Sequence, residues 1–251
     1  MKRLPVLVLI CVLALALWSC GRRDAVADST TVYEVSSEVC SLDVRINAAD
    51  FRIECADCFS VESNLKNLEV TVTNGVLRII DRAQSNSNYS GATLTLYVPD
   101  DTVFDEVDIS TGAAKLTAEV LSARSVELSL GAGDVRFERL VASSEVDIEG
   151  GAGQITVADG ELNDLSLKMG MGELNLSAAL SGYSELEFGV GEANITVIGS
   201  RDEYKVDIEK GLGAITVDGK DASDFGSGGS GYNTIQIEGG IGAIHLNFKE
   251  A

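Results

Sequence analysis

Apolar and polar residues alternate in short runs along most of the chain, and the runs from about residue 126 to residue 246 share one layout. Each run is interrupted by a glycine, a single residue and a second glycine. Strict alternation is the period of a β-strand, whose successive side chains point to opposite faces. The pattern therefore predicts short strands that each carry a pair of glycines. The pairs are Gly131/Gly133, Gly151/Gly153, Gly170/Gly172, Gly189/Gly191, Gly211/Gly213 and Gly240/Gly242, preceded by the degenerate copy Thr111-Gly112-Ala113-Ala114.

The positions around each pair also repeat. Counted from the first glycine, positions minus five, minus three and minus one are mostly apolar, and apolar residues return at plus four and plus six, as in Val135 and Phe137. Residues three apart, such as Ala132 and Val135, cannot share one face of a regular strand, so the chain must bend or bulge at the glycines. We call each pair a glycine corner. The residues between the glycines are apolar, and we assign them to the inward face: Ala132, Ala152, Met171, Val190, Leu212 and Ile241.

The spacing of the corners predicts the fold. First glycines follow one another after 20, 19, 19, 22 and 29 residues. A fixed period of this size is typical of solenoids, in which no single unit buries its apolar face alone. With 26 glycines, only 2 prolines and many β-branched residues, the chain reads as all-β. We expect a single-chain parallel β-solenoid, or β-helix, whose coils of about 20 residues each stack on the next around a dry interior.

Two residues depart from the repeat. Lys210 falls on the inward parity, and Ala193 is small where other copies carry Leu, Ile or Val. Because a buried unpaired lysine is rare, we expect Lys210 to lie at a widened corner and to reach solvent.

The balance of charges limits the partners. The formal net charge is −20, and nucleic-acid binding requires a basic face, so a nucleic-acid partner is excluded. Solvated carboxylates on the outward strand positions account for this charge, although it also permits a cation-rich partner.

The N-terminus has the order of an export signal: a basic start, then an apolar run from Leu4 to Trp18. Leu17-Trp18-Ser19-Cys20 resembles the lipobox of bacterial lipoproteins, with Trp18 in place of the usual small residue. We therefore expect residues 1–19 to be a lipoprotein signal peptide, Cys20 to carry the lipid anchor, and residues 20–31 to form a polar tether outside the cytoplasm. Cleavage after Ala27, giving a secreted protein, and an uncleaved signal anchor are the alternatives.

Three further cysteines lie in the mature chain. Cys55 and Cys58 are three apart, so a disulfide between them across a turn is our first choice, and a Cys40–Cys58 pair between adjacent coils is the alternative. One Cys-x-x-Cys with a single distant thiol does not make a zinc site, so we expect no metal.

The sequence contains segments that partly match catalytic or cofactor-binding motifs, but none of these matches is complete. The Gly-x-Gly copies lack the third glycine and the following helix of a dinucleotide loop, and the aspartates of a calcium-binding β-roll are replaced by apolar residues such as Ile155. The single histidine, His245, alternates outward without a nucleophile motif. Asp134, Glu173 and Glu192 stack at one repeat position and predict a charged rim rather than a catalytic set. We expect no cofactor and no enzymatic activity.

We assign residues 32–251 to one solenoid domain. Residues 32–105 form irregular N-terminal coils and a cap, because terminal coils of solenoids are usually atypical. Residues 106–251 form the regular repeats, interrupted by an extruded loop from Lys220 to Asn233 that accounts for the 29-residue step.

Several segments together resemble the DUF4097-type adhesin family of bacterial envelope proteins with β-strand repeats. The resemblance spans about Val35 to Phe248 and rests on Leu94 to Pro99, Val107 to Gly112, Leu130 to Asp134, Met169 to Leu174, Asp207 to Gly211 and Gly239 to Gly242. It implies a β-solenoid at the cell surface, often in lipoproteins or envelope-stress loci, and brings no catalytic residues. The cysteine trio departs from the family pattern.

Our leading functional hypothesis is a monomeric, non-catalytic, membrane-tethered module that binds a protein, a glycan or a cationic peptide along one face. The alternative is an accessory protein of envelope stress that senses cationic peptides through its acidic surface. A glycan-active enzyme with clustered carboxylates is the third hypothesis.

Overall fold

The computed structural model describes residues 24–84, 86–222 and 231–250, and the regular structure in this part is β apart from short 3₁₀ segments. The predicted all-β class is confirmed. The first strands are β1 (Val26–Glu34), β2 (Ser41–Ile46), β3 (Asp50–Ala56), β4 (Ser60–Leu65), β5 (Leu68–Thr73), β6 (Val76–Asp81), β7 (Thr93–Pro99) and β8 (Phe104–Ala113). They are followed by β9 (Lys115–Val157), β10 (Gly160–Asn163), β11 (Leu165–Ser181), β12 (Tyr183–Ile198), η2 (Arg201–Glu203), β13 (Tyr204–Glu209), β14 (Leu212–Val217), β15 (Lys220–Asp221), β16 (Asn233–Glu238) and β17 (Ile241–Lys249).

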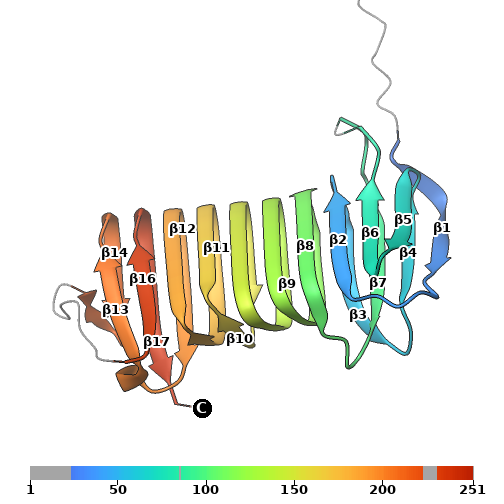
Figure 1. Ribbon diagram of the computed structural model, residues 1–251. Coiled ribbons are helices and arrows are strands. Elements are labelled where there is room, and N and C mark those ends of the chain that lie inside the picture. The colour runs from blue at the N-terminus through green and yellow to red at the C-terminus, as the bar shows by residue number, and fades with distance from the viewer. Residues whose placement is uncertain (1–23, 85, 223–230, 251) are drawn as a thin grey trace, which may run out of the picture.

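The regular repeats form coils that lie side by side in a long solenoid-like stack (Figure 1). Strand β11 pairs in parallel with β9 on one side and with β12 on the other. The register is that of the repeat, since Leu167 lies between Ile148 and Leu186. Because each coil pairs with its neighbour at the same repeat position, equivalent residues form rows along the stack.

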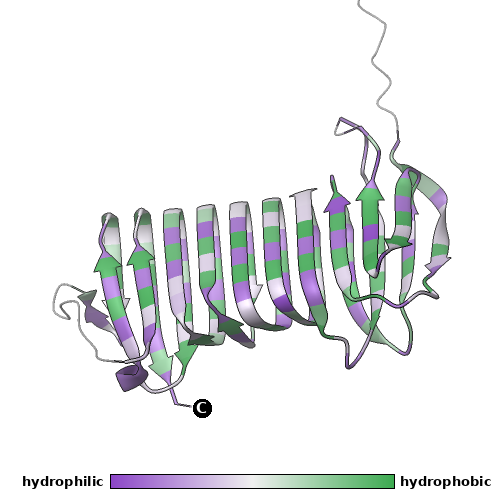
Figure 2. Ribbon diagram, in the orientation of Figure 1, coloured by the Kyte–Doolittle hydropathy of each residue, from purple (hydrophilic) through white to green (hydrophobic). Residues whose placement is uncertain are grey.

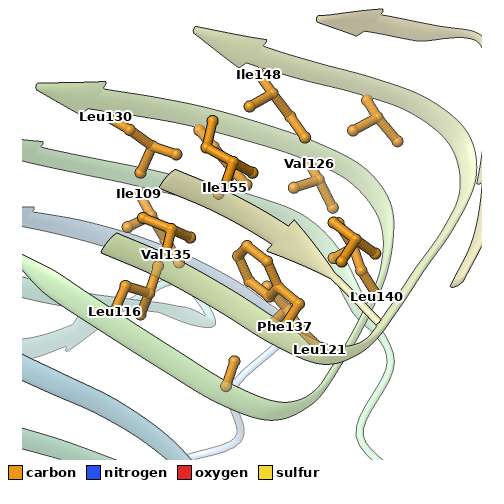
Figure 3. Packing of buried hydrophobic residues seen from close by; sticks show 14 of the residues in the cluster. Ile109, Leu116, Leu121, Val126, Leu130, Val135, Phe137, Leu140, Ile148 and Ile155 are labelled. Atoms are coloured by element: carbon orange, nitrogen blue, oxygen red, sulfur yellow. The ribbon is translucent and has the colours of Figure 1, made fainter. Parts of the chain in front are cut away.

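The interior between the two walls of each coil is apolar. The residues predicted to point inward at positions plus four and plus six are buried, including Val135, Ile155, Leu174 and Ile215, which are 4%, 3%, 0% and 2% exposed. Figure 3 shows such side chains from successive coils meeting in one interior, and Figure 2 shows the alternation of hydrophobic and hydrophilic residues along the strands. Burial of this continuous column drives the stacking, because an isolated coil would leave its apolar side in water.

The coils do not follow one another in chain order at the C-terminal end, contrary to the expectation that each coil stacks on the next. The last coil, β16 and β17, pairs with β12 on one side and with β13 and β14 on the other. The coil of β13 and β14 is therefore outermost, and the C-terminal coil fills the place inside it (Figure 1). Strand β15 then pairs antiparallel with β14 within the predicted Lys220–Asn233 loop, whose residues 223–230 lie outside the described part.

The N-terminal end shows the same interleaving. Strands β2 and β3 lie between the coil of β6 and β7 and the coil of β8 and β9. Strands β4 and β5 join β7 and β6 in antiparallel pairs, and β1 pairs antiparallel with β4. Antiparallel strands therefore cover this end of the stack.

Candidate functional site

The second glycine of each corner allows the coils to approach closely. At Gly133, Gly153, Gly172, Gly191 and Gly242, φ lies between +134° and +146°. A Cβ at any of these positions would overlap the backbone carbonyl of the neighbouring coil. The corners are thus aligned from coil to coil with backbone against backbone. Glycine is required at these positions for two reasons, the positive φ and the lack of space for a Cβ.

The residues between the glycines face outward, so their predicted inward assignment is wrong. Alternation places the residue before the first glycine inside, but the first glycine and the residue after it are both exposed. The chain bends at the glycines, and this extra outward residue shifts the parity before the middle position is reached. Alternation is then regular again, and positions plus four and plus six return to the interior as predicted.

The shifted parity creates an exposed line of apolar side chains, which we call the corner ridge. In spatial order its members are Ala113, Ala132, Ala152, Met171, Val190, Ile241 and Leu212. Its last four side chains are large, and Met171, Val190, Ile241 and Leu212 are 59%, 47%, 55% and 83% exposed. Neighbouring coils lie about 4.8 Å apart, so these four form one continuous apolar strip at the C-terminal end of the stack.

An open groove of about 730 Å³ runs beside the corners. Its lining includes the first glycines Gly131, Gly151, Gly170 and Gly189, which leave the backbone uncovered. Side chains that line it include Glu149, Lys168, Glu187 and Glu238. Lys168 Nζ lies 3.1 Å from Glu187 Oε1, and this pairing raises the pKa of the lysine. The groove is therefore acidic overall.

Acidic residues also follow the other side of the ridge. Glu173 lies next to Glu192 in the neighbouring coil, and Asp134 occupies the equivalent place nearer the N-terminus. All three are exposed, as the predicted charged rim requires. Asn175 Nδ2 donates to Glu173 Oε1 at 2.7 Å, which holds one carboxylate along the strand. In the last two coils the equivalent residues are Ala243 and Ala214, so the strip is widest there.

The strands that lead into the corners carry a second acidic surface. Glu127 lies beside Asp108, and Asp147 follows in the next coil. Repulsion from Asp108, together with desolvation and the charges of Asp147, Glu106 and Glu149, raises the pKa of Glu127. The stacking that aligns apolar residues inside thus also aligns like charges outside.

The cysteines are free thiols in the described part of the chain: Cys55 and Cys58 are exposed and Cys40 is partly buried. The predicted disulfide, Cys55–Cys58 or Cys40–Cys58, stays a prediction. Burial, together with the nearby carboxylates of Asp100 and Glu119, raises the pKa of Cys55. Cys20, the predicted lipid anchor, lies outside the described residues.

The remaining candidates are placed as follows. His245 faces outward and is half-buried, with Nδ1 2.8 Å from Thr216 Oγ1. The described residues hold no group of three or more His, Cys, Asp or Glu side chains arranged to bind a metal. Within the same ranges, no helix has the length and hydrophobicity needed to cross a membrane.

The ridge is the feature that sequence reasoning missed. Its signal was the apolar residue enclosed by two glycines, which becomes larger from Ala132 to Met171 and beyond.

The architecture agrees with a known protein family. A family model described as Toastrack DUF4097 matches residues 35–247. The chain belongs to the DUF4097 family. The resemblance inferred from the repeat motifs is thereby confirmed, over almost the same span. A search of curated proteins finds no match for this DUF4097 protein.

Solved structures similar to this DUF4097 protein include two that are each described as a "putative adhesin". The one from Bacteroides fragilis is 14% identical with a TM-score of 0.47, and the match covers 87% of this chain and 96% of the other. The one from Parabacteroides distasonis is 13% identical with a TM-score of 0.45, covering 88% and 96%. A "putative cell adhesion protein" from Clostridium sporogenes is 15% identical with a TM-score of 0.38, covering 88% and 99%.

Proposed function

We propose that this DUF4097 protein is a non-catalytic cell-surface module that binds its ligand along the corner ridge. The observation that carries the proposal is the row of exposed Met171, Val190, Ile241 and Leu212 in a chain of net charge −20. Contiguous exposed apolar side chains bordered by polar ones are typical of interaction sites. Covering them gains roughly 25 cal/mol for each Å² removed from water, which favours a ligand that lies along the stack.

The proposal includes the form and attachment of the molecule. We take residues 32–251 as a single-chain parallel β-solenoid, because the coils from β8 to β17 pair in parallel and in repeat register. We take Cys20 as the lipidated residue, on the strength of the N-terminal sequence alone. The predicted tether of residues 20–31 has to be shortened, because Val26–Glu34 form β1 and pair with β4, so we propose that only the residues before Asp24 act as the tether. This arrangement would hold a monomeric rod at the outer face of a membrane, outside the cytoplasm.

Charged substitutions on the ridge test the binding site. The double variant Val190→Asp/Ile241→Asp places carboxylates in the middle of the strip, and Val103→Asp is the control because Val103 is an exposed valine remote from the ridge. On a glycan array and a panel of envelope proteins, we expect the double variant to lose at least about tenfold in affinity while the control binds like the parent. Equal binding by all three would reject the ridge as the site. Turnover of any arrayed glycan would contradict the non-catalytic assignment.

A second candidate function is the sensing of cationic peptides. The observation in its favour is that acidic residues border the ridge on both sides, with Glu149, Glu187 and Glu238 in the groove and Asp134, Glu173 and Glu192 on the rim. An amphipathic peptide of alternating Lys and Leu would place its apolar side on the ridge and its charges beside these rows. Its binding should weaken steeply as salt increases, and absence of binding at low salt would reject this candidate.

A further inference from the structure

Lys210 belongs to a row that is otherwise interior. In spatial order the residues before the first glycine are Ile46, Thr111, Leu130, Gly150, Met169, Phe188, Gly239 and Lys210. All of the members before Lys210 are buried or half-buried. Lys210 alone is exposed, with 41% of its side chain accessible, and its Nζ lies 3.7 Å from Asp221 Oδ2. The expectation that Lys210 reaches solvent is met because its coil is the outermost one.

Either of the two C-terminal coils, β13/β14 or β16/β17, has its glycines at the positions needed to align with those of β12. Gly240 and Gly242 stand level with Gly189 and Gly191 of β12, and Gly213 stands level with Gly242. The coil of β13 and β14 carries the same pair of glycines, and a glycine at position 213 can adopt the positive φ of the other corners, so this coil is able to pair with β12 directly in chain order. Backbone geometry therefore permits two arrangements, and side chains must select between them.

The position of Lys210 in its row differs between the observed order of the coils and an order that follows the chain. In chain order, Lys210 would lie between Phe188 and Gly239, within the apolar surroundings that these residues share with Ile215 and Ile244. A charged amine there would lose part of its hydration against Phe188 and Ile215, which is unfavourable. In the observed order, Gly239 takes that place instead. A Cβ on Gly239 would come within 2.9 Å of Ile215 Cδ1, so this position leaves no room for a side chain in the observed order.

The connection before β13 also fits the observed order. β11 and β12 are joined by Gly182 alone, whereas Gly199 to Glu203, including η2, separate β12 from β13. The longer link carries the chain past one coil position. It explains the step of 22 residues between Gly189 and Gly211.

We propose that Lys210 fixes the order of the last two coils and ends the stack. Its charge excludes its own coil from an interior position, so the C-terminal coil is inserted between that coil and β12. The same charge at the outermost position opposes the addition of a further coil from a second copy of the chain, since inward-pointing charges protect sheet edges. The C-terminal coil is thereby held by hydrogen-bonded partners on both sides.

Disulfide trapping tests the order of the coils. In a chain whose native cysteines are replaced by serine, the pair Asn194→Cys/His245→Cys reports the observed order, because these residues are direct neighbours. The pair Asn194→Cys/Thr216→Cys reports chain order, since Thr216 is two coils away and outside the reach of a disulfide. With Lys210 present, we expect only the first pair to close.

Substitution of Lys210 should change that pattern. With Lys210→Met, we expect the ratio of the second disulfide to the first to increase about tenfold, because the cost of desolvating the charge in chain order is removed. End-to-end dimers detected by light scattering would be the corresponding result if the variant instead adds a coil from a second copy. Lys210→Gln should act in the same direction if the methionine variant fails to fold, and Lys210→Arg should keep the parent pattern. Lys205→Met is the matched control, because Lys205 points outward from the same coil. If both Lys210→Met and Lys210→Gln fold as monomers with the parent disulfide pattern, the proposal is overturned.

Discussion

At each corner a single hydrogen atom in place of a side chain decides whether two coils fit together. The repeat identified these glycines correctly from spacing alone, and the predicted bend lies where they stand. Spacing did not reveal which side of the bend holds the extra outward residue, because an apolar residue such as Ala132 satisfies either parity. That choice depends on the backbone contact of the second glycine with the next coil.

Substitution of a second glycine should therefore be costly. Gly172→Ala puts a methyl group into the carbonyl of Gly153 at a φ of +136°, and we expect it to reduce the free energy of unfolding by at least about 3 kcal/mol. Gly219→Ala is the control, because Gly219 also has positive φ (+73°) but would meet no atom within 4 Å, and we expect a loss of about 1 kcal/mol. Urea denaturation measures both values. Equal losses would show that close approach of the coils is not the constraint.

Among the elements, the strands were largely predictable and their order was not. Alternating apolar residues in the sequence mark β2 (Ser41–Ile46), with Leu42, Val44 and Ile46, and β3 (Asp50–Ala56), with Phe51 and Ile53. Alternation identifies a strand but does not select its neighbour, since the regular repeats from Gly131 onward all carry the same pair of glycines. The unequal steps of 22 and 29 residues were the available sign of a skipped position at the C-terminal end.

A polar network fixes the segment between β6 and β7 to the corner region of β2 and β3. Tyr89 Oη donates to Asp81 Oδ2 at 2.6 Å, and Asn47 Nδ2 donates to Tyr89 Oη at 2.9 Å. Burial and the Asp81 carboxylate raise the pKa of Tyr89 to about 12. The folded state therefore keeps the phenol protonated where the unfolded chain has already lost the proton.

Stability should consequently fall as the pH rises from about 10 to 12. The decrease in the free energy of unfolding should be smaller in Tyr89→Phe, which has no proton to lose at this position. Denaturation of both proteins at pH 9, 10 and 11 measures the difference, with values chosen from the ordinary tyrosine pKa of about 10 upward. Parallel curves would exclude a contribution from Tyr89.

For the whole molecule, stacking in register orders charge as well as apolar surface. The net charge of −20 was evident from composition, but its arrangement in rows beside the ridge follows only from the coil register. Repulsion along the acidic face opposes folding, and the interior column outweighs it. The pKa of Glu127 is raised because repulsion from neighbouring carboxylates dominates there, whereas the pKa of Glu138 is lowered because it accepts hydrogen bonds from Arg136.

Two glutamine substitutions should therefore have opposite effects at pH 7. Glu127→Gln removes a carboxylate whose raised pKa makes its ionisation unfavourable to folding, so the melting temperature should rise. Glu138→Gln removes one whose lowered pKa favours the folded state, so the melting temperature should fall slightly. Both differences should fade as the pH falls below the ordinary glutamate pKa and as salt is added. Shifts of the same sign would contradict this account of the acidic face.

The most direct test of the account is the accessibility of single cysteines on either side of a corner. In a chain without native cysteines, we measure maleimide labelling of Met171→Cys, Val190→Cys and Ile241→Cys against Val135→Cys, Ile155→Cys and Leu174→Cys. The structure predicts rapid labelling of the first set, which lies on the ridge, and protection of the second set until the protein is unfolded. Protection of the ridge positions together with rapid labelling of the second set would contradict both the outward ridge and the stacked interior.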